Sequence, residues 1–155
     1  MKSSRDCLLS LVDPQWGRTV EEAQKVDPFC GPLMRLCRLA VDELTLQERS
    51  KIRQFSVLDN LLFYTPERGG ASVARLCVPG SYNNAIRLTV LFETHEAYLH
   101  QGAEKTYQRM HAGYYWPTMI SDIQRYVNSC QSCRRMKSRN HAETGALEGH
   151  SIPSQ

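Results

Sequence analysis

Four residues in the second half of the chain have side chains of the kind that bind zinc. His95 and His100 form one pair, and Cys130 and Cys133 form another after an insert of 29 residues. Two imidazoles and two thiolates complete the tetrahedral shell of a structural zinc ion and leave no position open for a substrate. We therefore predict that these four residues bind Zn²⁺. Free thiols or a redox-active Cys-x-x-Cys pair are the alternatives, and a redox motif leaves the two histidines unexplained.

The spacing of the two histidines predicts a break in the helix that carries the first of them. A step of five residues rotates about 500° on an ideal helix, so the two side chains would point about 140° apart. Both can reach one ion only if that helix ends before His100, and Gln101-Gly102 favours a turn directly afterwards. A ββα finger is excluded, because there the cysteines come first and the insert is only about a dozen residues.

Three helical patterns surround the predicted ligands. They begin near Asn84, Ala103 and Thr118, and Trp116-Pro117 separates the last two. Their recurring residues are Leu88, Leu91, Phe92, His95 and Leu99 in the first, Ala103, Tyr107, Met110 and Tyr114 in the second, and Ile120, Ile123, Val127 and Cys130 in the third. We expect the second and third to form a helix-turn-helix-like pair whose ends the zinc ion joins.

The region before residue 84 is expected to combine short helices with a small sheet. Capping boxes that start at Thr19 and Thr45 predict two helix beginnings, and Pro32 suits the first position of a further helix. The chain then predicts strands at 55–58 and 61–65, joined at Asp59-Asn60, and a third strand at 74–78. The predicted fold class is therefore α+β and mainly helical, with a helix and β-hairpin extension before a zinc-stapled helical domain.

Positive charge is concentrated near the predicted zinc site. The net charge of the chain is only +3, but residues 104–139 hold seven Lys or Arg against two Asp or Glu. Such a segment suits a polyanion, and an ordinary solvated face is the alternative. The candidate nucleic-acid contacts are Lys105 and Arg109 on one helix and Arg134, Arg135, Lys137 and Arg139 after the cysteines. These would contact the DNA backbone independently of sequence.

The cysteines and the hydropathy of the chain indicate its redox environment and whether it spans a membrane. Only Cys130 and Cys133 among the six cysteines have ligand spacing, and no disulfide framework is visible, so we expect a reducing, intracellular environment. No apolar run approaches the roughly 20 residues of a membrane helix, so no membrane partner is expected. His111, His141 and His150 are expected to be exposed polar residues. No paired carboxylates indicate phosphoryl chemistry, and no small-molecule substrate is expected.

Beyond these patterns, the sequence resembles the HHCC zinc-binding domain of gypsy-type LTR retrotransposon integrases over about residues 88–140. The resemblance is carried by His95, His100, Gly102, Lys105-Thr106, Tyr114-Tyr115-Trp116-Pro117, Met119, Asp122-Ile123, Tyr126-Val127, Cys130 and Cys133. It implies zinc ligation by the four residues, binding of element DNA ends, self-association with other integrase chains, and action in the nucleus. In such polyproteins a catalytic core follows this domain.

The resemblance and the patterns together predict four regions. They are an irregular lead-in at 1–18, an extension at 19–83, the zinc-binding domain at 84–139, and a flexible linker at 140–155 toward a catalytic core that is absent from this sequence. No enzymatic activity is therefore expected of the chain itself. Two functions stay open: a nucleic-acid-binding integrase module, or a protein–protein interaction module retained from a transposable element without DNA binding.

Overall fold

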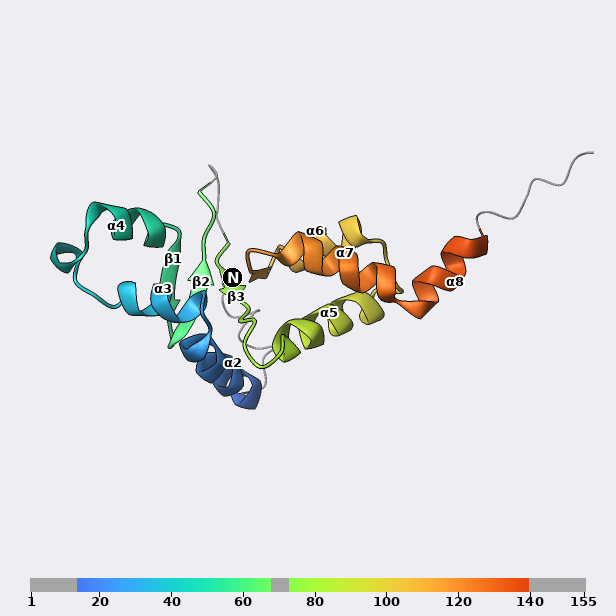
Figure 1. Cartoon of the computed structure of the whole chain (residues 1–155), viewed down its shortest axis with the longest axis horizontal. Coiled ribbons are helices and arrows are strands. Elements are labelled where there is room, and N and C mark those ends of the chain that lie inside the picture. Colours follow the sequence, from blue (N-terminus) through green and yellow to red (C-terminus); the bar gives the residue numbers. More distant parts are fainter. Residues whose placement is uncertain (1–13, 68–72, 140–155) are drawn as a thin grey trace, which may run out of the picture.

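The computed structural model describes residues 14–67 and 73–139 (Figure 1). Over these residues the chain is mainly helical with one small sheet, which confirms the predicted fold class. The elements are α2 (Pro14–Val26), α3 (Cys30–Leu36), the 3₁₀ turn η1 (Val41–Glu43), α4 (Leu46–Ile52), β1 (Phe55–Leu58), β2 (Leu61–Tyr64), β3 (Arg75–Cys77), α5 (Ala85–Ala97), α6 (Ala103–Met110), β4 (Tyr114–Tyr115), α7 (Met119–Ser129) and α8 (Gln131–Arg139). The predicted linker and most of the predicted lead-in lie outside the described residues.

The predicted hairpin forms as expected. Strands β1 and β2 pair antiparallel, with Leu58 opposite Leu61, so only Asp59 and Asn60 make the turn. Both turn residues have positive φ, 49° and 62°, which gives the turn a twist that matches that of the flanking strands. The capping box of α4 also forms, because the Thr45 hydroxyl accepts from the Glu48 amide and the Glu48 carboxylate accepts from the Thr45 amide.

The sheet has a fourth strand that the sequence did not predict. Its order is β1-β2-β3-β4, and β4 pairs in parallel with β3. The amides of Leu76 and Val78 donate to the carbonyls of Gly113 and Tyr115 at 2.8 and 2.9 Å. Tyr114 was expected on a helix face with Met110, but α6 ends at Met110 and Tyr114 lies in this strand. Two residues are too few to give a strand pattern.

A second expectation about local structure was also wrong. Helix α2 begins at Pro14 rather than at Val20, so Thr19 lies inside the helix and its hydroxyl donates to the Gln15 carbonyl at 3.0 Å. Pro14 is the better start signal, because proline fixes the helical φ and lacks the amide that a first turn leaves unbonded.

One hydrophobic core unites the extension with the helices around the predicted ligands. It contains Val20 and Ala23 of α2 together with Val90 of α5, Met110 of α6 and Ile123 of α7. Because the sheet also runs from β1 in the extension to β4 between α6 and α7, both the sheet and this core cluster cross the predicted boundary at residue 84. That boundary stays a prediction.

The buried face of α5 differs from the predicted one. Ile86, Val90, Leu91 and His95 are buried, which confirms that His95 faces the core. By contrast, Leu88, Phe92 and Leu99 are exposed, because α5 packs on the core along the line of Ile86 and Val90 instead. Apolar residues lie on several sides of α5 and not only on the buried one, so periodicity alone could not identify the buried side.

Two buried polar side chains of the α2 region join the segments that follow it. The Gln24 amide lies beyond the last β2–β3 pair, donates to the Leu62 and Cys77 carbonyls at 3.3 and 2.6 Å, and accepts from the Leu62 amide at 2.8 Å. The Asp27 carboxylate is 3% exposed. Its Oδ1 accepts from the amides of Phe29 and Cys30, and its Oδ2 accepts from those of Gly80 and Ser81, over 2.7 to 3.1 Å. Asp27 thus anchors the loop that leads into α5.

We predict that Asp27→Asn lowers the free energy of unfolding by about 2–3 kcal/mol. The NH₂ group that replaces one carboxylate oxygen cannot accept the hydrogen bonds that backbone N–H groups now donate to that oxygen. Urea unfolding followed by circular dichroism measures the change. The matched control is Asp59→Asn in the exposed hairpin turn, where asparagine tolerates the positive φ and stability should change little. Equal effects of the two substitutions would contradict the anchoring role of Asp27.

Candidate metal centre

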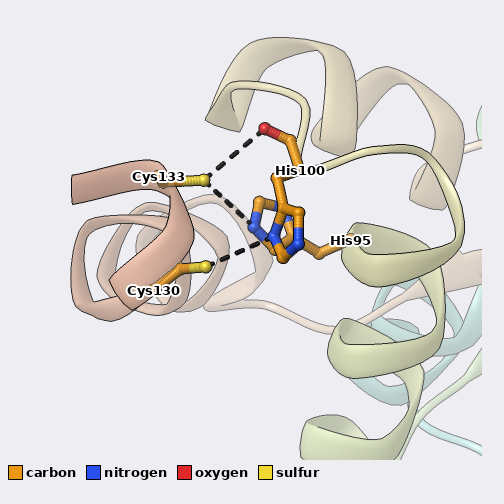
Figure 2. A group of neighbouring side chains, drawn as sticks. All are labelled: His95, His100, Cys130 and Cys133. Atoms are coloured by element: carbon orange, nitrogen blue, oxygen red, sulfur yellow. Dashed lines mark hydrogen bonds between the residues drawn. The ribbon is translucent and has the colours of Figure 1, made fainter. Parts of the chain in front are cut away.

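The four predicted ligands come together where α5, α7 and α8 meet (Figure 2). His95 lies in the last turn of α5, and His100 lies three residues after that helix ends. Cys130 is the residue that follows α7, and its extended backbone (ψ 121°) breaks the chain direction before α8 begins at Gln131. Cys133 lies in the first turn of α8. The expected break between the two histidines is confirmed.

The end of α5 explains how two histidines five residues apart reach one point. The His100 amide donates to the His95 carbonyl at 3.1 Å, and the Leu99 amide donates to the Glu96 carbonyl at 3.3 Å. These two bonds define a Schellman motif, which reverses the chain at a helix C-terminus. The motif needs a left-handed residue just past the cap, and Leu99 supplies it with φ 57°. His100 follows with φ 54°, so its side chain turns back toward His95.

The distances among the side chains suit a tetrahedral ion. All four ligand atoms lie within 4.8 Å of one another. Cys133 Sγ is 3.3 Å from His95 Nε2, and Cys130 Sγ is 3.4 Å from His100 Nδ1. Bonds of about 2.0–2.1 Å to nitrogen and about 2.3 Å to sulfur would separate neighbouring donors of one zinc ion by roughly 3.3–3.8 Å. Four donor atoms at these distances fit a tetrahedral zinc ion.

The electrostatic setting also favours a cation. Burial lowers the pKa of His95, which is 1% exposed, so its imidazole is neutral near pH 7 and offers a lone pair. Its Nδ1 is buried and has no hydrogen-bond partner among the described residues, while Nε2 faces the cysteines. Burial and the neighbouring Cys130 raise the pKa of the Cys133 thiol. Two adjacent thiols resist ionising together, and a divalent cation would remove that penalty.

Glu96 is a part of the site that the sequence did not indicate. Its Oε2 lies 3.1 Å from His100 Nε2, on the side of the ring away from Cys130. A carboxylate in this place fixes the tautomer of a metal-binding imidazole and raises its basicity. The available signal was the four-residue step from Glu96 to His100. On a continuous helix that step would put both side chains on one face, but α5 ends between them.

The other predicted residues lie outside this cluster. His111 contacts the Arg75 guanidinium at 3.3 Å and is no part of the metal group, and His141 and His150 fall outside the described residues. Lys105 is exposed on α6. Arg109 stacks its guanidinium 3.9 Å over the Tyr98 ring and donates to Gln101. Arg134, Arg135, Lys137 and Arg139 belong to α8, so the basic segment after the cysteines is a helix that leads away from α7 (Figure 1).

The comparison with protein families bears on the same segment. Residues 82–139 match the integrase zinc binding domain family. The match starts in the loop before α5 and ends with α8, so it contains all four clustered ligands, and residues 82–139 are named the integrase-type region after it. Comparisons of the chain with curated proteins and with solved structures give no match. The gypsy-type likeness stays a prediction. In the described part of the chain, no helix combines the length and apolarity needed to span a membrane.

We predict that Cys130→Ser or His100→Ala abolishes stoichiometric zinc binding and unfolds the integrase-type region, because zinc binding and folding are one equilibrium in small zinc-stapled units. Elemental analysis of the purified chain and far-ultraviolet circular dichroism before and after chelation measure both effects. Cys37→Ser and His111→Ala are the matched controls and should retain the metal. Unchanged helicity of the wild-type chain after complete chelation would contradict the structural role of the ion.

Leu99 gives a second prediction. Its side chain is 87% exposed, so removing it loses little burial, whereas its left-handed backbone is unfavourable for any residue with a Cβ. Leu99→Gly should therefore raise the free energy of unfolding by about 0.5–1 kcal/mol after allowing for the greater freedom of glycine in the unfolded chain. Glu93→Gly, at an exposed position inside α5, should lower it by a similar amount. Destabilisation by both substitutions would contradict the strained Schellman turn.

Proposed function

We propose that the chain is the zinc-binding and nucleic-acid-binding module of a gypsy-type LTR retrotransposon integrase. In this role it holds the ends of the element DNA, contributes to assembly of the integrase multimer, and acts in the nucleus. The observation that carries the proposal is the family match over residues 82–139 together with the clustered pair of histidines and pair of cysteines inside it. Strand transfer would be the work of another part of the parent polyprotein.

The four ligands support a structural role for the metal. They fill a tetrahedral shell, so no coordination position is left for water or substrate. His95 and Cys133 lie on α5 and α8, and His100 and Cys130 lie just after the ends of α5 and α7. Zinc would therefore set the direction in which α8 leaves the body of the protein.

The distribution of charge supports DNA as the partner. Helix α8 carries Arg134, Arg135, Lys137 and Arg139 in its sequence and no acidic residue. Lys105 lies on the exposed side of α6, close in sequence to the ligand His100. Cations grouped on a fixed helix match the regular phosphates of a duplex and attract it over a distance.

The test is a salt titration of binding to duplex DNA by the zinc-loaded full chain. If the six candidate cations all contact phosphates, affinity should fall roughly a thousandfold between about 50 and 200 mM salt. The variant Arg134→Ala/Lys137→Ala should bind more weakly and show a shallower dependence on salt, because each lost phosphate contact reduces the slope by about one. The control Arg38→Ala/Lys51→Ala, on the far extension, should behave as wild type. Absence of binding at low salt would sink the proposal.

A second function is favoured by a different surface. Leu88 and Phe92 lie one turn apart on α5 and are 49% and 57% exposed. Apolar side chains grouped in this way are typical of protein contacts. A protein–protein module retained from a transposable element would bind through this face without binding DNA. Sedimentation of the wild type and of Phe92→Ser over a range of concentrations tests self-association there. A wild type that stays monomeric at every concentration would contradict self-association through this face.

A further inference from the structure

Helix α7 exposes a row of polar side chains that neither the zinc site nor the core uses. Ser121, Gln124, Arg125 and Asn128 are all exposed and are spaced by three, four and seven residues from the first. This spacing puts them on one side of the helix. Neither the Gln124 amide nor the Asn128 amide has a hydrogen-bond partner among the described residues, so their donors and acceptors face solvent.

The residue types in this row are those that read base edges. Arginine pairs with the two acceptors of guanine, glutamine and asparagine pair with the donor and acceptor of adenine, and serine accepts either role. Ile120, one turn before Gln124, is 55% exposed and offers an apolar contact of the kind a thymine methyl makes. Arg125 is the one cation of the row, whereas a surface that only neutralises phosphates would hold several.

The opposite side of α7 holds the helix rigidly. Met119, Ile123 and Val127 are buried in the core at 4%, 1% and 9% exposure. At the first turn, the Asp122 carboxylate accepts from the Trp116 indole at 2.8 Å and from the Thr118 hydroxyl at 2.7 Å. At the other end the chain passes directly into the ligand Cys130. A helix fixed at both ends and along one side presents its outer residues with little freedom left to lose on binding.

The surroundings of the row favour duplex DNA as its partner. Asp122 is the sole carboxylate of α7, and its side chain is 18% exposed and engaged at the first turn, where Arg125 also approaches it at 3.4 Å. The basic helix α8 starts at Gln131, just past the end of α7. A helix of 11 residues is about 16 Å long, and the major groove is about 12 Å wide and admits one helix. Neutral amides beside a cationic helix suit base edges flanked by phosphates.

We propose that α7 enters the major groove and reads base sequence through Gln124, Arg125 and Asn128, while the cations of α8 hold the adjoining phosphates. The inference rests on the proposed function, since it requires DNA binding, and it adds a sequence preference of a few base pairs. It adds base-specific contacts to the sequence-independent backbone contacts expected of the basic residues of α6 and α8.

The experiment selects bound duplexes from a randomised library with the zinc-loaded full chain at a salt concentration that permits binding. The wild type should enrich a short motif, and its affinity for that motif should exceed its affinity for a scrambled duplex by roughly tenfold or more per bidentate contact. Gln124→Ala/Asn128→Ala should remove the part of the motif that these two amides read, leave at most the contact of Arg125, and keep most of the affinity for scrambled DNA. The control Arg134→Ala/Lys137→Ala should weaken binding to both duplexes alike and keep the motif.

The outcomes separate this inference from the proposed function. Equal binding of all duplexes by the wild type overturns base reading by α7 and leaves DNA binding intact. A motif that survives unchanged in Gln124→Ala/Asn128→Ala also overturns it, because another surface must then read the bases. No binding to any duplex at low salt overturns both. Zinc content and helicity of each variant verify that these exposed substitutions leave the fold unaltered.

Discussion

The convergence of two imidazoles and two thiols at the junction of α5, α7 and α8 is the constraint on which the integrase-type region depends. The ligand atoms come from two stretches of chain, 95–100 and 130–133, and each stretch changes direction between its two ligands or at one of them. Helix α5 reverses at Leu99 before His100, and the chain kinks at Cys130 before α8 begins. Neither change is favourable on its own, because one uses a left-handed leucine and the other interrupts helical hydrogen bonding. A shared ion at that point would offset both costs.

The body behind this junction is held together by polar groups as well as by the core. Asp27 bonds four backbone amides from two segments, and Gln24 continues the contact between β2 and β3 where their regular pairing ends. Arg87 extends the connection, because its Nε donates to the Val78 carbonyl and its guanidinium lies over the Trp116 ring and near Asp122. Helix α7 is thereby tied to the extension through partly buried polar groups that interact with one another, and such a network is costly to separate.

Sequence reasoning worked best where chemistry or turn geometry limits the choice of residue. The ligands were predictable because only histidine and cysteine supply such donors, and the hairpin was predictable because Asp59-Asn60 tolerates positive φ. Strand β4 could not be found, since two tyrosines form a strand only because β3 lies beside them. The buried side of α5 was misjudged because Leu88 and Phe92 fit the apolar period as well as Val90 does. The roles of Glu96 and of the polar row on α7 could not be predicted, because they depend on which residues lie beside them in the folded chain.

The parallel pairing of β3 with β4 has a consequence for the order in which the protein assembles on the ribosome. Strand β3 is synthesised before Tyr114 and Tyr115, with which it pairs, and the core around Val20 lacks Met110 and Ile123 until the second half of the chain has been made. Until then the extension is incomplete, because β3 lacks its partner strand β4 and the apolar side chains around Val20 lack the residues of α6 and α7 that cover them. The two cysteines are translated after all of these residues, so a complete metal site becomes available only once every part of the sheet and of the core has been synthesised.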